Sequence, residues 1–335
     1  MEKYSQYRDK GSGIAPFFPV PTQRSGLMLP FHISLFLIRL PILITLALSY
    51  FFVLQWLPIG SLGRKAMLWL IQGTPGIWWI DLQIDGVRRG SLAKYHQTRL
   101  PQPSSIIACS YTSPIDSLYL ATVFDPIFTV SYPNTRKVQR ISTWKSIIRP
   151  LSYPKLEPPP KATLVDLSTL TRENPTRAIA VFPECTTTNG RGILAFSPSL
   201  LSASPTCKIF PVSIRYTSPD ITTPVPRTYF TFLWNLLSKS THCIRVRIAE
   251  PVYNSTRSMS YKPPSATTST DILQDDTASE STLATEDDEG LTSDERKTLD
   301  KVAEALARLG RVKRVGLGVK EKLGFVELWT RSKRR

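Results

Sequence analysis

The chain has 335 residues, of which 41% are apolar, and this is enough to bury one sizeable core. Its 42 lysines and arginines against 26 acids give a net charge of +16, which favours an anionic partner, either nucleic acid or a membrane surface. The four cysteines form no CxxC pair and the three histidines are widely scattered, so we expect no metal site and no requirement for an oxidising compartment.

The N-terminal part predicts a membrane anchor. Residues 1–28 are polar, with scattered glycine and proline, and predict a flexible tail. Leu40–Leu57 holds 18 residues without a charge and, as a helix, would be roughly 27 Å long, close to the hydrocarbon thickness of a bilayer. Arg39 separates this run from a shorter apolar run, Phe31–Ile38. We therefore expect a membrane anchor over residues 29–60.

Three arrangements of the anchor remain open. It could span the bilayer, or it could form a re-entrant hairpin that turns at Arg39 and Pro41 and stays in one leaflet. It could also be a buried core helix. A cleaved signal peptide is disfavoured, because the apolar region is long, begins late and lacks a small-residue cleavage site.

From residue 61 to residue 254, strand patterns alternate with helix patterns, which predicts an α/β domain. The sheet is expected to be mixed and largely parallel, with helices flanking it. The predicted strands are Ile80–Val87, Ser104–Cys109, Ile127–Tyr132, Ala178–Phe182, Lys208–Tyr216 and Cys243–Val252. The predicted helices are Pro114–Phe124, an apolar stripe from Val138 to Ile147, a stripe from Leu164 to Leu170, and Thr228–Leu237.

Composition changes sharply after this domain. Residues 255–295 are rich in Ser, Thr, Asp and Glu and predict a disordered acidic linker. Residues 296–335 hold thirteen lysines and arginines against four acids, and predict a basic amphipathic segment. This segment could bind a membrane surface or pack back on the core through an apolar stripe. The stripe consists of Leu299, Val302, Leu306 and Leu309.

The strand Ala178–Phe182 ends at Pro183 and is followed by a polar loop. The loop contains Glu184, three threonines (Thr186, Thr187 and Thr188), Asn189, Gly190 and Arg191. A carboxylate among hydroxyl donors, with an arginine, suits a phosphate or sugar-alcohol ligand. A solvated turn without a ligand is the alternative.

Three blocks in order carry a family resemblance. The segment from Phe182 to Thr187, FPECTT, resembles the FPEGT block of the PlsC-type glycerolipid acyltransferases. Asp116, in YTSPID, stands 68 residues earlier, where that family has an H-x4-D block. Phe210–Ile214, FPVSI, resembles its V-P-V-x-I block. With the basic tail, the chain resembles fungal lysophosphatidic acid acyltransferases.

The resemblance implies that the α/β domain has the PlsC-type acyltransferase fold. It also implies the reaction. An acyl-CoA-dependent O-acyltransferase would move a fatty acyl group onto a lysophospholipid. Lysophosphatidic acid would give phosphatidic acid, in glycerolipid and triacylglycerol synthesis. Acyl-CoA is then a co-substrate and no cofactor is expected. The expected partners are acyl-CoA, a lysophospholipid and a membrane, without nucleic acid. The expected location is the endoplasmic reticulum membrane or the lipid droplet.

The resemblance also implies residue roles. Asp116 and the residue at position 111 would be catalytic, and Glu184 and Thr186 would bind the acceptor. Position 111 holds Tyr111 instead of the family histidine. A free phenol, with a pKa of about 10, is a donor rather than a base at neutral pH. His96 is the nearest histidine in sequence and could serve only if its loop folded back to Asp116. A catalytically impaired lipid-binding protein of the same fold is therefore the alternative.

Two further departures affect the loop. Cys185 stands where the family has glycine, and we expect it to adopt an ordinary φ angle. Thr187 stands where the family commonly has arginine. Arg191, with Arg136 or Arg140, is therefore our candidate for the missing phosphate contact.

Overall fold

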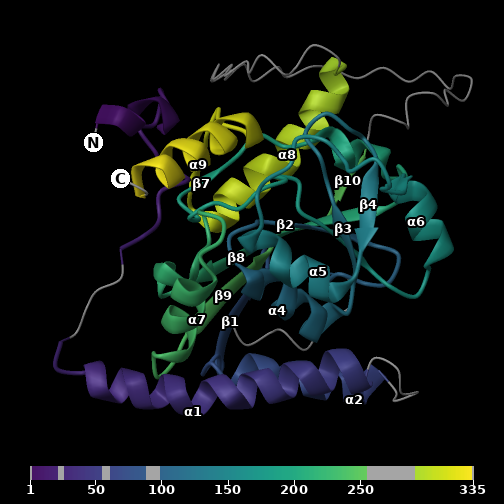
Figure 1. The fold of residues 1–335 in the computed structure, drawn as a ribbon. Coiled ribbons are helices and arrows are strands. Elements are labelled where there is room, and N and C mark those ends of the chain that lie inside the picture. Colours follow the sequence, from purple (N-terminus) through teal and green to yellow (C-terminus); the bar gives the residue numbers. More distant parts are fainter. Residues whose placement is uncertain (1, 22–25, 55–60, 88–98, 255–290, 334–335) are drawn as a thin grey trace, which may run out of the picture.

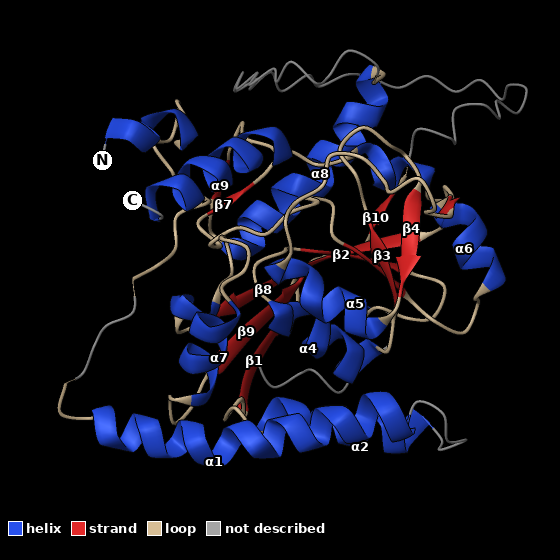
Figure 2. Cartoon of the chain, viewed as in Figure 1, coloured by secondary structure: helices blue, strands red, loops and turns tan. Residues whose placement is uncertain are grey.

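The computed structural model describes residues 2–21, 26–54, 61–87, 99–254 and 291–333 (Figure 1). Within them, a mixed sheet of nine strands lies between two layers of helices (Figure 2). Its strand order is β1-β9-β8-β2-β6-β3-β4-β5, and β10 pairs with β8. The bounds are β1 (Trp79–Ile84), β2 (Ile106–Cys109), β3 (Ile127–Val130), β4 (Val138–Ile141), β5 (Leu164–Val165), β6 (Ile179–Val181), β8 (Lys208–Tyr216), β9 (Cys243–Ile248) and β10 (Val252–Tyr253).

The central strands β8, β2, β6 and β3 are parallel, whereas β9, β4, β5 and β10 introduce antiparallel pairs. Every residue of β2, β3 and β6 is buried, as expected for strands covered on both faces. Their side chains alternate between two cores: Ile107 and Cys109 face one, while Ile106 and Ala108 face the other. The predicted α/β fold with a largely parallel mixed sheet is confirmed.

Helices cover both faces of the sheet. On one face lie α2 (Ser61–Gly73), α4 (Pro114–Phe124) and α7 (Tyr229–Leu237). On the other lie α6 (Leu167–Glu173) and α8 (Ser293–Gly310). Figure 1 shows α4 and α5 (Thr143–Ile148) in front of the sheet and α8 above it.

One predicted helix is wrong. The stripe from Val138 to Ile147 is divided into strand β4 and helix α5, with Ser142 as the N-cap of α5. Val138 pairs with β5, and Ile141 pairs with Phe128 of β3. The three-residue spacing of apolar residues that suggested one helix therefore arises here from a strand followed directly by a helix. In the same way, Leu164 belongs to β5, and α6 begins only at Leu167.

The segment predicted as a membrane anchor forms one continuous helix over its described residues. α1 (Leu29–Leu48) continues as a π-helix, η2 (Ser49–Leu54), and together they are long and apolar enough to cross a membrane by length and composition. Arg39 and Pro41 lie inside α1, so the hairpin at these residues is wrong. Most of its large apolar side chains are exposed, which also argues against a buried core helix. The last part of the predicted anchor, residues 55–60, lies outside the described residues.

The two ends of the chain pack together. The expectation of a flexible tail over residues 1–28 is wrong for residues 2–21, because Tyr7 and Phe17 are buried against Phe325 of α9 (Val319–Lys333). Figure 1 shows the N-terminal segment beside α9. A short helical turn, η1 (Glu2–Tyr7), supplies Tyr7.

The C-terminal segment packs on the core rather than standing apart from it. All four members of its predicted apolar stripe are buried. β11 (Lys313–Arg314) pairs in parallel with β7 (Gly192–Ile193), just after the polar loop. Residues 255–290 of the predicted linker lie outside the described residues, and its end is earlier than predicted, because Thr292 caps α8 and Glu295 lies in its first turn.

Candidate active site

Two acids meet at the carboxyl ends of neighbouring parallel strands. Glu184 follows β6, and Asp116 opens α4 just after β2. The backbone N–H of Tyr111 donates to Glu184 Oε1 at 3.3 Å, and that of Thr112 donates to Asp116 Oδ2 at 2.7 Å. Consecutive amides thus hold the two carboxylates. Parallel strands bring their following loops to one edge of a sheet, which is where ligands bind in open α/β folds.

Asp116 is fully buried and accepts a dense set of hydrogen bonds. The donors are the backbone N–H groups of Thr112 and Ser113, the Thr112 hydroxyl and the Tyr216 hydroxyl. Asp116 also completes a capping box with Ser113, which explains why α4 begins where the sequence predicts. Burial raises the pKa of Asp116 to about 6, even though these donors favour the carboxylate.

Glu184 is also buried, with 1% of its surface exposed. Its second oxygen accepts from the Leu194 N–H at 3.1 Å, so each oxygen accepts one hydrogen bond from a backbone amide. Burial raises the pKa of Glu184 to about 8, the Asp116 charge adds to this, and the charge of Lys322 opposes it. The protonation of Glu184 is therefore sensitive to its surroundings near neutral pH.

Tyr111 stacks on Phe182 with ring centroids 4.3 Å apart. Burial raises the pKa of Tyr111 far above its ordinary value, and the charge of Arg149 only partly opposes this. The phenol therefore stays protonated and can donate a hydrogen bond, but it cannot act as a base at neutral pH. His96, the other candidate base, lies outside the described residues.

The loop itself is held tightly. Thr186 is buried, and its N–H donates to the Glu184 carbonyl at 2.7 Å. Cys185 has a φ of +58°, so the expectation of an ordinary φ is wrong, and the left-handed conformation explains why glycine suits this position. Burial raises the pKa of the Cys185 thiol, which disfavours the reactive thiolate.

The three predicted arginines are not brought together at the acid pair. Arg191 is exposed and lines an open cavity of about 620 Å³ beside α8. Arg140 lines a different cavity, of about 820 Å³, whose wall includes Phe51 and Trp144. Neither cavity has Asp116 or Glu184 among the described residues that line it.

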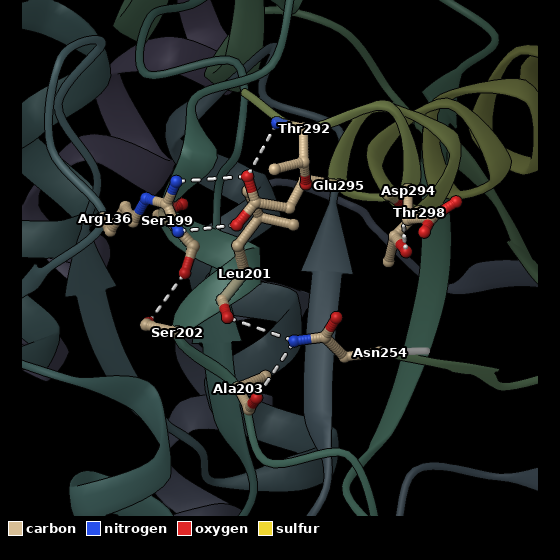
Figure 3. A network of polar contacts seen from close by, with 10 residues as sticks. All are labelled: Arg136, Ser199, Leu201, Ser202, Ala203, Asn254, Thr292, Asp294, Glu295 and Thr298. Atoms are coloured by element: carbon tan, nitrogen blue, oxygen red, sulfur yellow. Dashed lines mark hydrogen bonds and ion pairs between the residues drawn. The ribbon is translucent and has the colours of Figure 1, made fainter. Parts of the chain in front are cut away.

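Arg136 has a structural partner. Its guanidinium binds both carboxylate oxygens of Glu295, at 2.6 and 3.1 Å (Figure 3). Glu295 also accepts from the Thr292 N–H at 3.0 Å, and nearby Asn254 donates to the carbonyls of Leu201 and Ala203. This network ties the start of α8 to the sheet, so Arg136 is committed to it and not to the acid pair.

Two cations that the sequence reasoning missed act on the site. Lys322 of α9 donates to the Thr187 carbonyl at 2.5 Å and to its hydroxyl at 2.8 Å. Arg149 lies over the ring of Tyr132 at 5.6 Å, and its charge lowers the pKa values of Tyr111 and Cys185 against the effect of burial. No local pattern marks either residue, because both are far from the FPECTT block in sequence.

Comparison with known proteins agrees with this site. Residues 92–215 match the family model described as Acyltransferase, and this range includes Asp116 and Glu184. The chain is 28% identical to the putative lysophosphatidic acid:oleoyl-CoA acyltransferase of Schizosaccharomyces pombe over 75% of this chain and 85% of that protein. It is 24% identical to lysophosphatidic acid:oleoyl-CoA acyltransferase 1 of Saccharomyces cerevisiae over 75% of this chain and 84% of that protein. The resemblance inferred from the three blocks is confirmed.

Proposed function

Because residues 92–215 match the family model described as Acyltransferase, we propose that the protein transfers a fatty acyl group from acyl-CoA to lysophosphatidic acid. The product is phosphatidic acid. The names of both relatives specify this acceptor and an oleoyl-CoA donor, which supports the assignment. The reaction belongs to glycerolipid and triacylglycerol synthesis, at the endoplasmic reticulum membrane or the lipid droplet.

One observation carries the proposal: Asp116 and Glu184 are bound by consecutive amides at one edge of the sheet. Two buried acids with raised pKa values at the ends of parallel strands are typical of a catalytic site. Both also belong to the blocks that carry the family resemblance.

The chemistry assigns a role to each group. The acceptor hydroxyl oxygen bonds to the acyl carbon, the carbon–sulfur bond breaks, and the hydroxyl proton ends on the CoA thiol. Glu184 accepts a hydrogen bond from the acceptor hydroxyl and orients it. Tyr111 donates to the thioester carbonyl oxygen, where negative charge develops in the transition state. Asp116 holds the Tyr111–Ser113 turn, and Arg149 supplies positive charge near Tyr111.

Access from a membrane suits these substrates. α1 and η2 expose large apolar side chains along their length, including Leu37 of α1 at 63% and Phe52 of η2 at 71% exposure. An anchored enzyme meets a lysophospholipid where that lipid is concentrated, which supports a membrane as its working surface.

The test uses purified protein in detergent, labelled oleoyl-CoA and a panel of lysolipids. We expect turnover with lysophosphatidic acid that is abolished by Asp116→Asn and by Glu184→Gln. Glu327→Gln, at an exposed acid on α9, is the matched control and keeps wild-type turnover. Turnover that survives both site substitutions in folded protein would refute the assigned site.

A second function is favoured by Tyr111 in place of the family histidine. A lipid-binding protein of the same fold would bind lysophosphatidic acid or oleoyl-CoA without transfer. Absence of turnover with every acceptor, together with saturable lipid binding, would replace the transferase proposal with this one.

A further inference from the structure

Lys322 is the one lysine or arginine that is buried among the residues the structure describes, with 2% of its surface exposed. It lies on α9, outside the residues that match the acyltransferase family. Both hydrogen bonds of its ammonium go to Thr187, in the loop that follows Glu184. The C-terminal helix therefore reaches into the candidate site.

The contact fixes the loop from one side. Thr187 in turn donates its hydroxyl hydrogen to the Thr223 carbonyl at 2.7 Å, so this part of the loop is held between α9 and the segment that precedes α7. The backbone at Lys322 is fixed as well. Its N–H donates to the Gly318 carbonyl, and Phe325, one helical turn further along α9, is fully buried. The position of the Lys322 side chain against Thr187 is therefore set by the packing of helix α9.

Burying an ammonium is unfavourable unless it is paired and hydrogen-bonded, and an apolar side chain of similar length is often as stable. A role in the chemistry of the site would give such a lysine a function that an apolar side chain could not supply. Glu184 is the acid whose charge favours the charged form of Lys322, and Lys322 in turn favours the carboxylate of Glu184.

The other charged groups around the pair have defined effects. The charge of Asp116 raises the pKa of Glu184, whereas that of Lys322 lowers it. Both acids act on the buried Cys109 thiol and raise its pKa. The charge of Arg149 acts on Tyr111 and Cys185 and opposes the effect of burial on their pKa values. Burial itself lowers the pKa of Lys322 to about 7, so removing either partner changes the charge of the other near neutral pH.

We propose that Lys322 is a positioning residue of the acyltransferase site, which fixes the loop through Thr187 and, by its charge, favours the carboxylate form of Glu184 that binds the acceptor hydroxyl. The inference rests on the proposed function, since it assigns Lys322 a task in that reaction. It also makes the C-terminal helix part of the active site.

The test compares Lys322→Met, which keeps the stem but removes the charge and the donors, with Lys320→Met at an exposed lysine of the same helix. The value of kcat/KM for lysophosphatidic acid is measured from pH 6 to pH 9. In K322M the rise of kcat/KM with pH should move upward by about one pH unit, because an opposite charge near Glu184 has been lost. This gives a loss of about tenfold at pH 7.5, where K320M matches the wild type.

A measurement without turnover accompanies it. Hydrogen–deuterium exchange at the amides of residues 184–188 should be several-fold faster in K322M than in K320M. Should K322M fail to fold, Thr187→Val removes one of the two acceptors and is expected to give the same increase.

The outcomes separate the two ideas. Wild-type turnover with an unchanged pH profile in folded K322M overturns the role of Lys322 and leaves the transferase intact. If the wild type turns over no acceptor, the transferase proposal fails, and the role of Lys322 in the reaction fails with it. Unchanged exchange in K322M and T187V removes the contact with the loop as well.

Discussion

Phe325→Ala tests whether the C-terminal helix belongs to the core. Phe325 is fully buried on α9. The rings around it have centroids 5.1–6.1 Å away and belong to Tyr4, Tyr7, Phe17, Phe18 and Trp329. Truncating a buried phenylalanine costs about 3–5 kcal/mol, and a domain is typically stable by about 5–15 kcal/mol. The substitution should therefore remove a large part of the free energy of unfolding.

The measurement is denaturant unfolding in detergent, together with turnover at a temperature where the variant is folded. Leu328→Ala on the same helix is the control, because Leu328 is 38% exposed and its truncation should cost less than about 1 kcal/mol. F325A should also lower turnover, since α9 carries Lys322 into the site. Equal, small losses of unfolding free energy in both variants would refute the packing of α9 on the core. They would favour the alternative in which the basic C-terminal segment binds a membrane surface.

Three further predictions concern the site and the anchor. Tyr111→Phe should lower kcat by about 10²–10³-fold with an unchanged melting temperature, as expected for loss of a transition-state donor; an unchanged kcat would remove that role. Arg39→Leu should cost about 1.5–3 kcal/mol or more, measured by denaturant unfolding, because the guanidinium donates to the carbonyls of Pro75, Leu237, Lys239 and Ser240. Glu184→Gln tests the pH dependence: the folded pKa of about 8 lies above the ordinary value, so the stability from protonated Glu184 is present at low pH and is lost as pH rises through 8. The melting temperature of the wild type should therefore fall relative to that of E184Q between pH 5 and pH 8, and a constant difference would contradict the raised pKa.

Local signals explain which elements were predicted well. α4 begins and ends as predicted, because Pro114 and the Ser113–Asp116 capping box fix its start. β8 also matches at both ends, since its run of apolar residues is buried on both faces. The stripe from Val138 to Ile147 misled because β4 and α5 follow one another without a long loop.

The acids of the site could be predicted, whereas its cations could not. Asp116 and Glu184 each follow a recognisable strand, and strand order alone brings their loops together. Arg191 is close to Glu184 in sequence, but its side chain lies on the α8 side of the molecule. Lys322 reaches the site through long-range packing of α9, including that of the buried Phe325, which no short pattern records.

The position of Arg39 also constrains how the predicted anchor would meet a membrane. Arg39 lies near the middle of the helix from Leu29 to Leu54, and its guanidinium binds carbonyls in loops of the α/β domain. These loops must therefore lie at the same depth as the middle of the helix. If the helix crossed a bilayer upright, it would pull polar backbone into the hydrocarbon, where each unpaired carbonyl costs several kcal/mol. Figure 1 shows α1 running along one side of the domain, an arrangement that favours a helix lying in the surface of one leaflet.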